Sequence, residues 1–394
     1  MSINFLADHV QSLKSSAIRE LLQHSKMHDV ISLGGGIPNP ELFDNEGLNL
    51  ALEAVMNSQF NEAFQYGLSE GYPLLRYTIR DLCQERGISC EPDDILITSG
   101  SQQSLDLLAR TLINPKDKIV VERPTYLAAL QVFELAQADI HSIETDQDGM
   151  KIDELEALLA TTTIKAIYIV PTFSNPSGVT LSEKRRKRLV ELSKKYNFLI
   201  FEDDPYSEIN FTDRYFKTLH EYSTELGCSE NIIHTSTFSK ILAPGLRIGW
   251  LIAPKWIKQQ VINLKQATDL HSSSFSQVLI HQYIQTGRLE NQINLIRKHY
   301  KQKCNLLCEI LDKEMGEHLS FNKPLGGMFL WSSFKYDFDT TRWLNKALKH
   351  GVVYVPGEFF YNKTPDKRTL RMSYVTATES QIEIAVKRLK NALI

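Results

Sequence analysis

The sequence lacks the patterns that mark membrane, secreted and nucleic-acid-binding proteins. No apolar run approaches the about 18 consecutive residues that a membrane-spanning helix needs. The first residues, MSINFLADHVQSLKSS, lack the basic start and apolar stretch of a secretory signal. The 44 basic and 47 acidic residues nearly balance, whereas a general nucleic-acid binder carries a basic excess. We therefore expect a cytoplasmic protein that binds neither membranes nor nucleic acids.

The cysteines give no sign of a metal site or of a disulfide framework. Cys83, Cys90, Cys228, Cys304 and Cys308 form no CxxC pair and no Cys/His spacing typical of bound metal. An odd number of cysteines in a long chain fits a reducing compartment. We predict reduced, partly buried thiols and no metal.

What the sequence does contain is an alternation of strand and helix patterns. Strands are expected at 95–100, 118–124, 139–143, 166–170, 198–204, 231–240 and 247–253. Helices are expected at 8–24, 46–58, 72–86, 102–113, 125–137, 182–196 and about 276–313. This alternation predicts an α/β fold with a mostly parallel central sheet, whose chemistry lies at the carboxyl ends of the strands.

The chain is long enough for more than one domain. We predict a large domain at 46–290 and a smaller α+β domain at 291–394, which has short strands and a final helix. Residues 1–45 would form an N-terminal segment that joins the small domain. The basic run EKRRKR at 183–188 falls on a predicted helix, and we interpret it as a solvated helix face.

Lys240 stands in the segment TFSKILAPGLRIGW (237–250), directly after a predicted strand. A lysine that acts as a nucleophile must be desolvated so that its amine is available. Thr237, Ser239 and Arg247 could surround an anion beside it. Serine–lysine pairs are common, but Ser-Lys followed by Pro-Gly-x-Arg-x-Gly-Trp is a far more specific combination.

The segment FEDDPY (201–206) ends an apolar strand with two carboxylates. Such carboxylates are costly to bury unpaired, and they could simply cap the next helix. Alternatively, Asp203 could pair with a cationic ring nitrogen such as that of pyridoxal phosphate, which keeps the ring an electron sink. Tyr206 would then reach the phenolic oxygen of that cofactor.

The segment TSGSQQSLDLL (98–108) reads as a strand end, a turn of small residues and a helix start. The N–H groups and dipole of a helix start bind anions readily, although Ser and Gly are also common in ordinary turns. The segment is neither a Walker loop nor a GxGxxG motif, so a dinucleotide site is not supported.

Together these segments resemble the fold-type I pyridoxal-phosphate enzymes of the aminotransferase class I/II group. Ten landmarks stand in the family's order: SLGGGIPNPELF, QYGLSEGYPLLR, TSGSQQSLDLL, ERPTYLAAL, VPTFSNPSGVT, FEDDPY, TFSKILAPGLRIGW, PLGGMFLW, VPG and LRMSY. The resemblance runs from about Ser16 to the last helix. It is closest to 2-aminoadipate and kynurenine aminotransferases and to the aminotransferase-like domain of MocR regulators. It implies an aspartate-aminotransferase-like fold, pyridoxal phosphate as cofactor and a homodimer.

The resemblance assigns a role to each matched cofactor residue. Lys240 would hold the cofactor as a Schiff base and act in catalysis with Asp203 and Tyr206. The residues that would bind the phosphate are Ser101, Gln102, Thr237, Ser239 and Arg247. The residues that would contact the ring are Tyr126 by stacking, Asn175 and Tyr206 at the phenolic oxygen, and Asp203 at the ring nitrogen.

Other roles reach the substrate and the neighbouring subunit. Arg371 would grip the substrate α-carboxylate through a bidentate fork, with Asn175 and Gly36 beside it. Tyr66 would reach the phosphate of the neighbouring subunit's cofactor. Simpler roles stay open: Tyr126 could pack as core, Arg371 could form a structural salt bridge, and Tyr66 could be an ordinary interface aromatic. Ser207 stands where many relatives have glycine, but no matched residue is affected.

The implied reaction is transamination by a ping-pong route through pyridoxamine phosphate, with 2-oxoglutarate as the usual acceptor in amino-acid metabolism. The expected donors are 2-aminoadipate, aromatic or branched-chain amino acids. In SSAIRELL (15–22), Ser16 and Arg19 match residues that face the substrate side chain in 2-aminoadipate aminotransferases. Arg19 could pair with a distal carboxylate or could be a solvated arginine.

Two other functions remain possible on this fold. One is a pyridoxal-phosphate lyase or decarboxylase, which would release products without an oxo-acid acceptor. The other is a pyridoxal-phosphate-sensing regulator, which carries a winged helix ahead of this domain. The chain begins directly at the domain, which disfavours the regulator.

Overall fold

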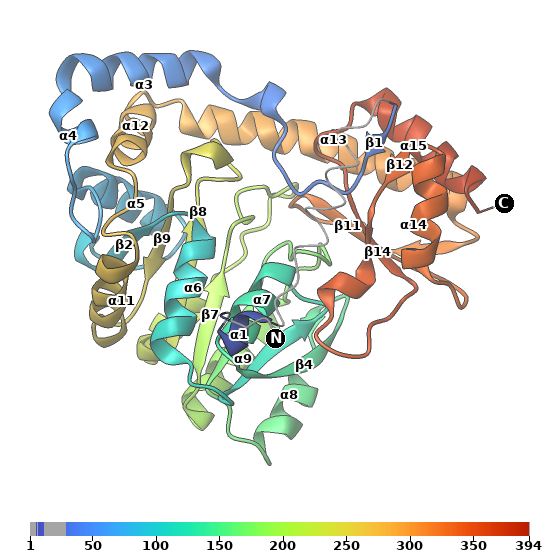
Figure 1. Cartoon of the computed structure of the whole chain (residues 1–394), viewed down its shortest axis with the longest axis horizontal. Coiled ribbons are helices and arrows are strands. Elements are labelled where there is room, and N and C mark those ends of the chain that lie inside the picture. The colour runs from blue at the N-terminus through green and yellow to red at the C-terminus, as the bar shows by residue number, and fades with distance from the viewer. Residues whose placement is uncertain (1–4, 6, 12–28, 394) are drawn as a thin grey trace.

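The computed structural model describes residues 5, 7–11 and 29–393 (Figure 1). Of the helix expected at 8–24, α1 (Asp8–Gln11) is helical, and the remainder lies outside the described residues. No helix in the described ranges is long and apolar enough to cross a membrane.

An eight-stranded sheet forms the centre of the molecule. The strands, in spatial order, are β2 (Ile95–Thr98), β9 (Gly249–Ile252), β8 (Ile232–Thr237), β7 (Leu199–Asp203), β6 (Ala166–Ile169), β3 (Lys118–Arg123), β4 (Asp139–Asp146) and β5 (Gly149–Met150). From β8 to β4 all neighbours are parallel, whereas β9 runs antiparallel to both β2 and β8. The expected mostly parallel α/β sheet is therefore confirmed.

Helices cover both faces of this sheet. Successive side chains of a strand point to opposite faces, so each strand packs against helices on both sides. Phe201 on β7 packs in a cluster with Phe133 of α7, whereas its neighbour Ile200 packs in another with Leu189 of α9. The helices of the large part are α3 (Asn45–Ser58), α4 (Phe60–Phe64), α5 (Pro73–Glu85), α6 (Ser101–Leu112), α7 (Leu127–Leu135), α8 (Ile152–Leu159), α9 (Glu183–Tyr196), α10 (Leu219–Glu225), α11 (Lys255–Thr268) and α12 (Ser274–Gln285).

The carboxyl ends of the parallel strands meet at one edge of the sheet, and most of the expected site residues follow those ends. In spatial order, β2 leads into Ser101, β8 into Lys240, β7 into Tyr206, β6 into Asn175 and β3 into Tyr126. Residues that are far apart in the chain therefore lie in a row along a single edge.

The C-terminal part adds a four-stranded antiparallel sheet in the order β10 (Leu319–Phe321), β11 (Phe329–Phe334), β14 (Thr369–Ser373) and β13 (Val355–Pro356). Its helices are α13 (Leu289–Met315), α14 (Thr340–Lys349) and α15 (Glu379–Asn391). Figure 1 shows α13 running from the region of α3 and α12 to this part. Strand β1 (Ile31–Ser32) pairs in parallel with β12 (Val352–Val353), as a joining N-terminal segment would. The domain boundaries themselves stay a prediction.

Two expectations about helices are wrong. The long helical stretch expected at about 276–313 is interrupted and forms two helices, because the chain turns at Gly287, whose φ of +73° suits glycine and ends α12. The basic run 183–188 is not a wholly solvated face, because Arg186 is fully buried. Its guanidinium donates to the carbonyls of Leu181, Lys217 and Pro171 and to the hydroxyl of Thr172.

Candidate active site

Lys240 lies in the turn after β8 and is half-buried at the sheet edge. Its Nζ donates to the carbonyl of Gly36 at 3.3 Å. Burial lowers the pKa of Lys240 to about 8, and the positive charges of Arg247 and Arg371 act in the same direction. Much of this lysine is therefore neutral at a mildly alkaline pH, as a nucleophilic amine must be.

Asp203 ends β7 close to this lysine, and its side chain is buried. Its Oδ2 accepts a hydrogen bond from the Tyr168 hydroxyl at 2.8 Å, while its buried Oδ1 has no partner. Burial raises the pKa of Asp203 to about 6, although the Tyr168 bond opposes the shift. Asp203 does not cap the next helix, since that role falls to Thr218. A buried carboxylate oxygen without a partner is unusual, and it fits a missing cationic or N–H donor.

The turn between β2 and α6, where the sequence predicts an anion site, brings the start of α6 close to β9 and Arg247. Gly100 occupies the N-cap with φ of +82°, and it has no side chain to accept the first N–H groups of the helix. A Cβ atom at Gly100 would lie 2.7 Å from Arg247 Nη2, and one at Gly249 would lie 2.7 Å from the Ser101 nitrogen. Glycine at both positions lets three chain segments approach one small space in front of Ser101.

Thr237, Ser239 and Arg247 line the other side of that space. The Thr237 hydroxyl donates to Ser239 Oγ at 2.9 Å. Arg247 reaches Ser239 Oγ through Nη1 at 3.4 Å and the Ser99 carbonyl through Nη2 at 3.1 Å. Two hydroxyls, one guanidinium and a helix start thus converge, which is a suitable environment for a phosphate group.

Arg371 enters from the small part on β14 and is almost fully buried. Its Nη1 donates to Asn175 Oδ1 at 2.7 Å and its Nη2 to the Gly34 carbonyl at 2.8 Å. The guanidinium carbon lies 4.2 Å from the ring centre of Phe329 and 5.0 Å from that of Phe360. Burial lowers the pKa of Arg371 to about 10. No carboxylate of the described residues pairs with Arg371, so the proposed structural salt bridge is not found there.

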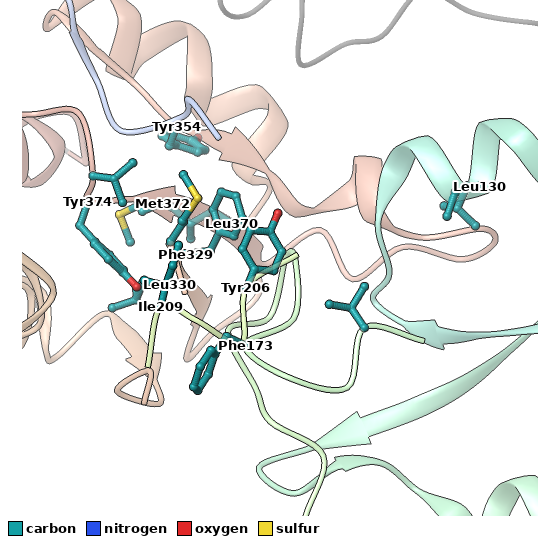
Figure 2. Packing of buried hydrophobic residues seen from close by; sticks show 14 of the residues in the cluster. Leu130, Phe173, Tyr206, Ile209, Phe329, Leu330, Tyr354, Leu370, Met372 and Tyr374 are labelled. Carbon is teal, nitrogen blue, oxygen red and sulfur yellow. The ribbon is translucent and has the colours of Figure 1, made fainter. Parts of the chain in front are cut away.

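Tyr206 and Asn175 lie beside this arginine. Burial raises the pKa of Tyr206, and a hydrogen bond with Asn175 opposes the increase. The Tyr206 ring meets Phe329 edge to face, with centroids 5.9 Å apart (Figure 2). A side chain at Gly36 would fit tightly, because its Cβ atom would lie 3.0 Å from Phe329 Cζ, although its distance of 3.7 Å from Arg371 Nη2 is an ordinary contact.

The remaining expected residues fall into three groups. The Tyr126 hydroxyl donates weakly to Gln102 Oε1 at 3.4 Å, which places both at this edge. Tyr66 is 79% exposed, and its ring meets that of His271 edge to face. Ser16 and Arg19 lie outside the described residues.

Three residues that the sequence did not single out also support the site. Tyr168 bonds Asp203, and Phe329 and Phe360 enclose the Arg371 guanidinium. Tyr168 lies on β6, next to β7. The strand pattern could have predicted to which face of the sheet its side chain points, but not that its hydroxyl bonds Asp203. Phe329 and Phe360 come from the small part, and no local pattern relates them to Arg371.

These residues fit pyridoxal phosphate. The phosphate matches the space in front of Ser101, the ring nitrogen matches the unpartnered Asp203 Oδ1, and the aldehyde carbon matches the Lys240 amine. In the described part of the chain, no group of three or more His, Cys, Asp or Glu side chains could hold a metal ion.

Comparison with known proteins agrees with this chemistry. The family model "Aminotransferase class I and II" matches residues 29–389. Aromatic-amino-acid aminotransferase 1 of Thermococcus litoralis is 40% identical over 99% of this chain and 94% of its own length. An uncharacterized HTH-type transcriptional regulator of Bacillus subtilis is 28% identical over 98% of this chain and 78% of its own.

Solved structures give the same result. A Pyrococcus horikoshii kynurenine aminotransferase in complex with PMP has a TM-score of 0.93 at 40% identity, covering 99% of this chain and 96% of that one. A Thermus thermophilus alpha-aminoadipate aminotransferase, complexed with N-(5'-phosphopyridoxyl)-L-leucine, has a TM-score of 0.92 at 30% identity, covering 98% and 97%. This chain therefore belongs to the aminotransferase class I and II family and is a pyridoxal-phosphate-dependent aminotransferase.

Proposed function

We propose that this enzyme transfers the α-amino group of aromatic, branched-chain or 2-aminoadipate donors to a 2-oxo acid, chiefly 2-oxoglutarate. The observation that carries the proposal is that the half-buried Lys240 and the buried Asp203 lie at one sheet edge, with the buried Arg371 entering from the small part. The similarity to an aromatic-amino-acid aminotransferase supports the aromatic donors. The aromatic side chains around Arg371 offer an apolar wall for such substrates.

The proposed roles follow from chemistry and position. Pyridoxal phosphate supplies a ring that withdraws electrons from the substrate α-carbon. Asp203, as a buried carboxylate, would pair with the ring nitrogen and favour its protonated form. Lys240, as a neutral amine, would accept the proton from the substrate α-carbon and, as the resulting ammonium, would donate it again, so that it would serve first as general base and then as general acid. Arg371 exchanges its bond to Asn175 or Gly34 for the substrate carboxylate and so orients the α-carbon.

A half-reaction screen tests this function. The purified holoenzyme is mixed with one amino acid at a time, and loss of the visible absorbance of bound cofactor is followed. Aromatic, branched-chain and 2-aminoadipate donors should bleach the band, and 2-oxoglutarate should restore it. If no amino acid bleaches the band, or if ammonia and an oxo acid form without an acceptor, transamination is refuted.

We further propose a homodimer in which Tyr66 reaches the neighbouring subunit's cofactor phosphate. Its support is the exposure of apolar side chains between residues 52 and 77, which a monomer would leave in water. These side chains are Leu52, Met56, Phe60, Phe64, Tyr66, Leu68, Leu74 and Tyr77. A cytoplasmic location stays a prediction, supported by five free, buried cysteines.

Mixed dimers test the shared site. Lys240→Ala and Tyr66→Ala subunits are each expected to be nearly inactive as homodimers. In a mixed dimer, one site would combine Lys240 of one chain with Tyr66 of the other and regain activity. If activity does not return after the two variants are unfolded and refolded together, Tyr66 does not act across the interface.

Arg19 is the proposed selector for acidic side chains, with Ser16 beside it. Replacing Arg19 by alanine should raise the KM for 2-aminoadipate much more than the KM for leucine or phenylalanine. Equal effects on acidic and apolar donors would contradict this role.

A further inference from the structure

A second buried lysine, Lys265, lies on α11 behind the turn that opens α6. Its Nζ donates to Gln103 Oε1 at 2.9 Å, to Ser272 Oγ at 3.1 Å and to the two carboxylate oxygens of Asp269 at 2.9 and 3.0 Å. The side chain is fully buried. Burial lowers the pKa of Lys265, and the ion pair with Asp269 opposes the decrease. An ammonium group in such a position is costly unless its N–H donors are satisfied, and here they are.

Two of the three acceptor residues of Lys265, Gln103 and Ser272, also hold Ser99. The Ser99 nitrogen donates to Gln103 Oε1 at 2.7 Å, and Ser99 Oγ lies 3.0 Å from Ser272 Oγ. The third polar group of Ser99, its carbonyl, accepts from Arg247. Gln103 is fixed further by Asp269, whose Oδ2 accepts from its Nε2 at 2.6 Å. Ser99 is therefore held by bonds on three sides, two of which lead to Lys265.

Ser99 precedes Gly100 and the first N–H groups of α6, which face the proposed phosphate position. Hydrogen-bond donors bind an anion more tightly when their positions are already fixed, because less conformational entropy is then lost on binding. A cation that fixes Gln103 and Ser272 therefore fixes the phosphate-binding turn without touching the phosphate.

We propose that Lys265 is a positioning residue for the phosphate group of the cofactor, acting through Gln103, Ser272 and Ser99. The proposal rests on the proposed phosphate site at Ser101. It assigns Lys265 an effect on the phosphate group alone, not on the ring or on Lys240.

The test compares two cofactors that differ only in the phosphate. Apoprotein with Lys265→Met is titrated with pyridoxal phosphate and with pyridoxal, and the two Kd values are read from the visible absorbance. Loss of the charged hydrogen bonds should raise the Kd for pyridoxal phosphate by about tenfold. The Kd for pyridoxal should change by less than about twofold, because pyridoxal does not use the turn. The matched control is Lys258→Met, two turns earlier on α11 and half-buried, which should change neither value.

A merely structural lysine gives a different result. If both Kd values rise by the same factor, or if neither changes, the proposal is wrong. If Lys265→Met does not fold, the same titrations are made with Ser272→Ala, which removes one link between Lys265 and Ser99. A loss of affinity confined to pyridoxal phosphate supports the proposal, and an equal loss of affinity for both compounds overturns it. If the unaltered protein binds both compounds equally well, the phosphate site itself is refuted and this inference falls with it.

Discussion

Replacing Arg371 by lysine tests the proposed carboxylate site most directly. The guanidinium is enclosed by Phe329 and Phe360, and its terminal nitrogens bond Asn175 and Gly34. A lysine ammonium is a point charge without a planar fork, so it cannot form two parallel bonds to a carboxylate. Arg371→Lys therefore keeps the charge but loses one hydrogen bond of the pair.

The magnitude follows from the number of bonds lost. A hydrogen bond to a charged group contributes about 1.5–3 kcal/mol, so a loss of about 2 kcal/mol corresponds to about a 30-fold decrease in kcat/KM. Arg371→Gln loses the charge and both bonds, or about 4 kcal/mol, which is on the order of a 1000-fold decrease.

The assay follows cofactor bleaching by phenylalanine and by 2-phenylethylamine, which lacks the α-carboxylate. Both variants should lose rate with phenylalanine but not with the amine. The control is Arg368→Lys, because Arg368 lies three residues earlier and pairs with Asp366 at the surface. If Arg371→Lys keeps the normal kcat/KM for phenylalanine, or loses activity with both compounds alike, Arg371 does not bind the substrate carboxylate.

Three further predictions follow from buried groups. Burial raises the pKa of Asp203 from 3.8 to about 6, so ionised Asp203 lowers the free energy of unfolding of the apoprotein, and this effect reaches its full size above pH 6. Asp203→Asn should therefore raise the free energy of unfolding by about 3 kcal/mol at pH 8, and by less at pH 5, in urea titrations, while transamination is largely lost; equal stability at pH 8 would contradict the burial argument. The pKa of Lys240 is lowered to about 8, so the rate of cofactor attachment to the apoprotein should rise as pH increases through 8, and a rate independent of pH from 7 to 9 would refute this. Arg186→Met removes the hydrogen bonds to four acceptors, of which the Pro171 carbonyl still accepts from the Leu181 N–H, and should lower the free energy of unfolding by about 3 kcal/mol or more. Arg188→Ala, at the surface, should leave the urea midpoint nearly unchanged, and equal effects would be inconsistent with the buried position of Arg186.

The strands and the row of site residues could be predicted because each depends on a short stretch of chain. A buried strand such as 198–204 needs a continuous apolar run, and polar residues directly after it lie at the carboxyl end of the sheet. The order of the strands could not be predicted in this way. Strand β9 lies between β2 and β8 and runs antiparallel to both. This order depends on contacts between segments that are far apart in the sequence.

Arg186 shows the limit of a charge pattern. In the sequence it is one of several basic residues on a helix, and most of its neighbours are indeed exposed or half-buried. It is buried because acceptors from residues 171–172, 181 and 217 surround it. Those acceptors are backbone carbonyls and one hydroxyl, and no sequence pattern marks them.

The sequence by itself determined the family and the cofactor of this protein, because ordered motifs identify both. The same motifs predict Lys240, Asp203 and the turn before Ser101 as site residues. The tertiary structure decided the state of those groups. Asp203 and Lys240 have shifted pKa values because segments from both parts of the chain exclude water around them. Burial and hydrogen-bond partners depend on residues distant in sequence, so only the folded chain could show that burial lowers the pKa of Lys240 and that Lys265 bonds Gln103 and Ser272.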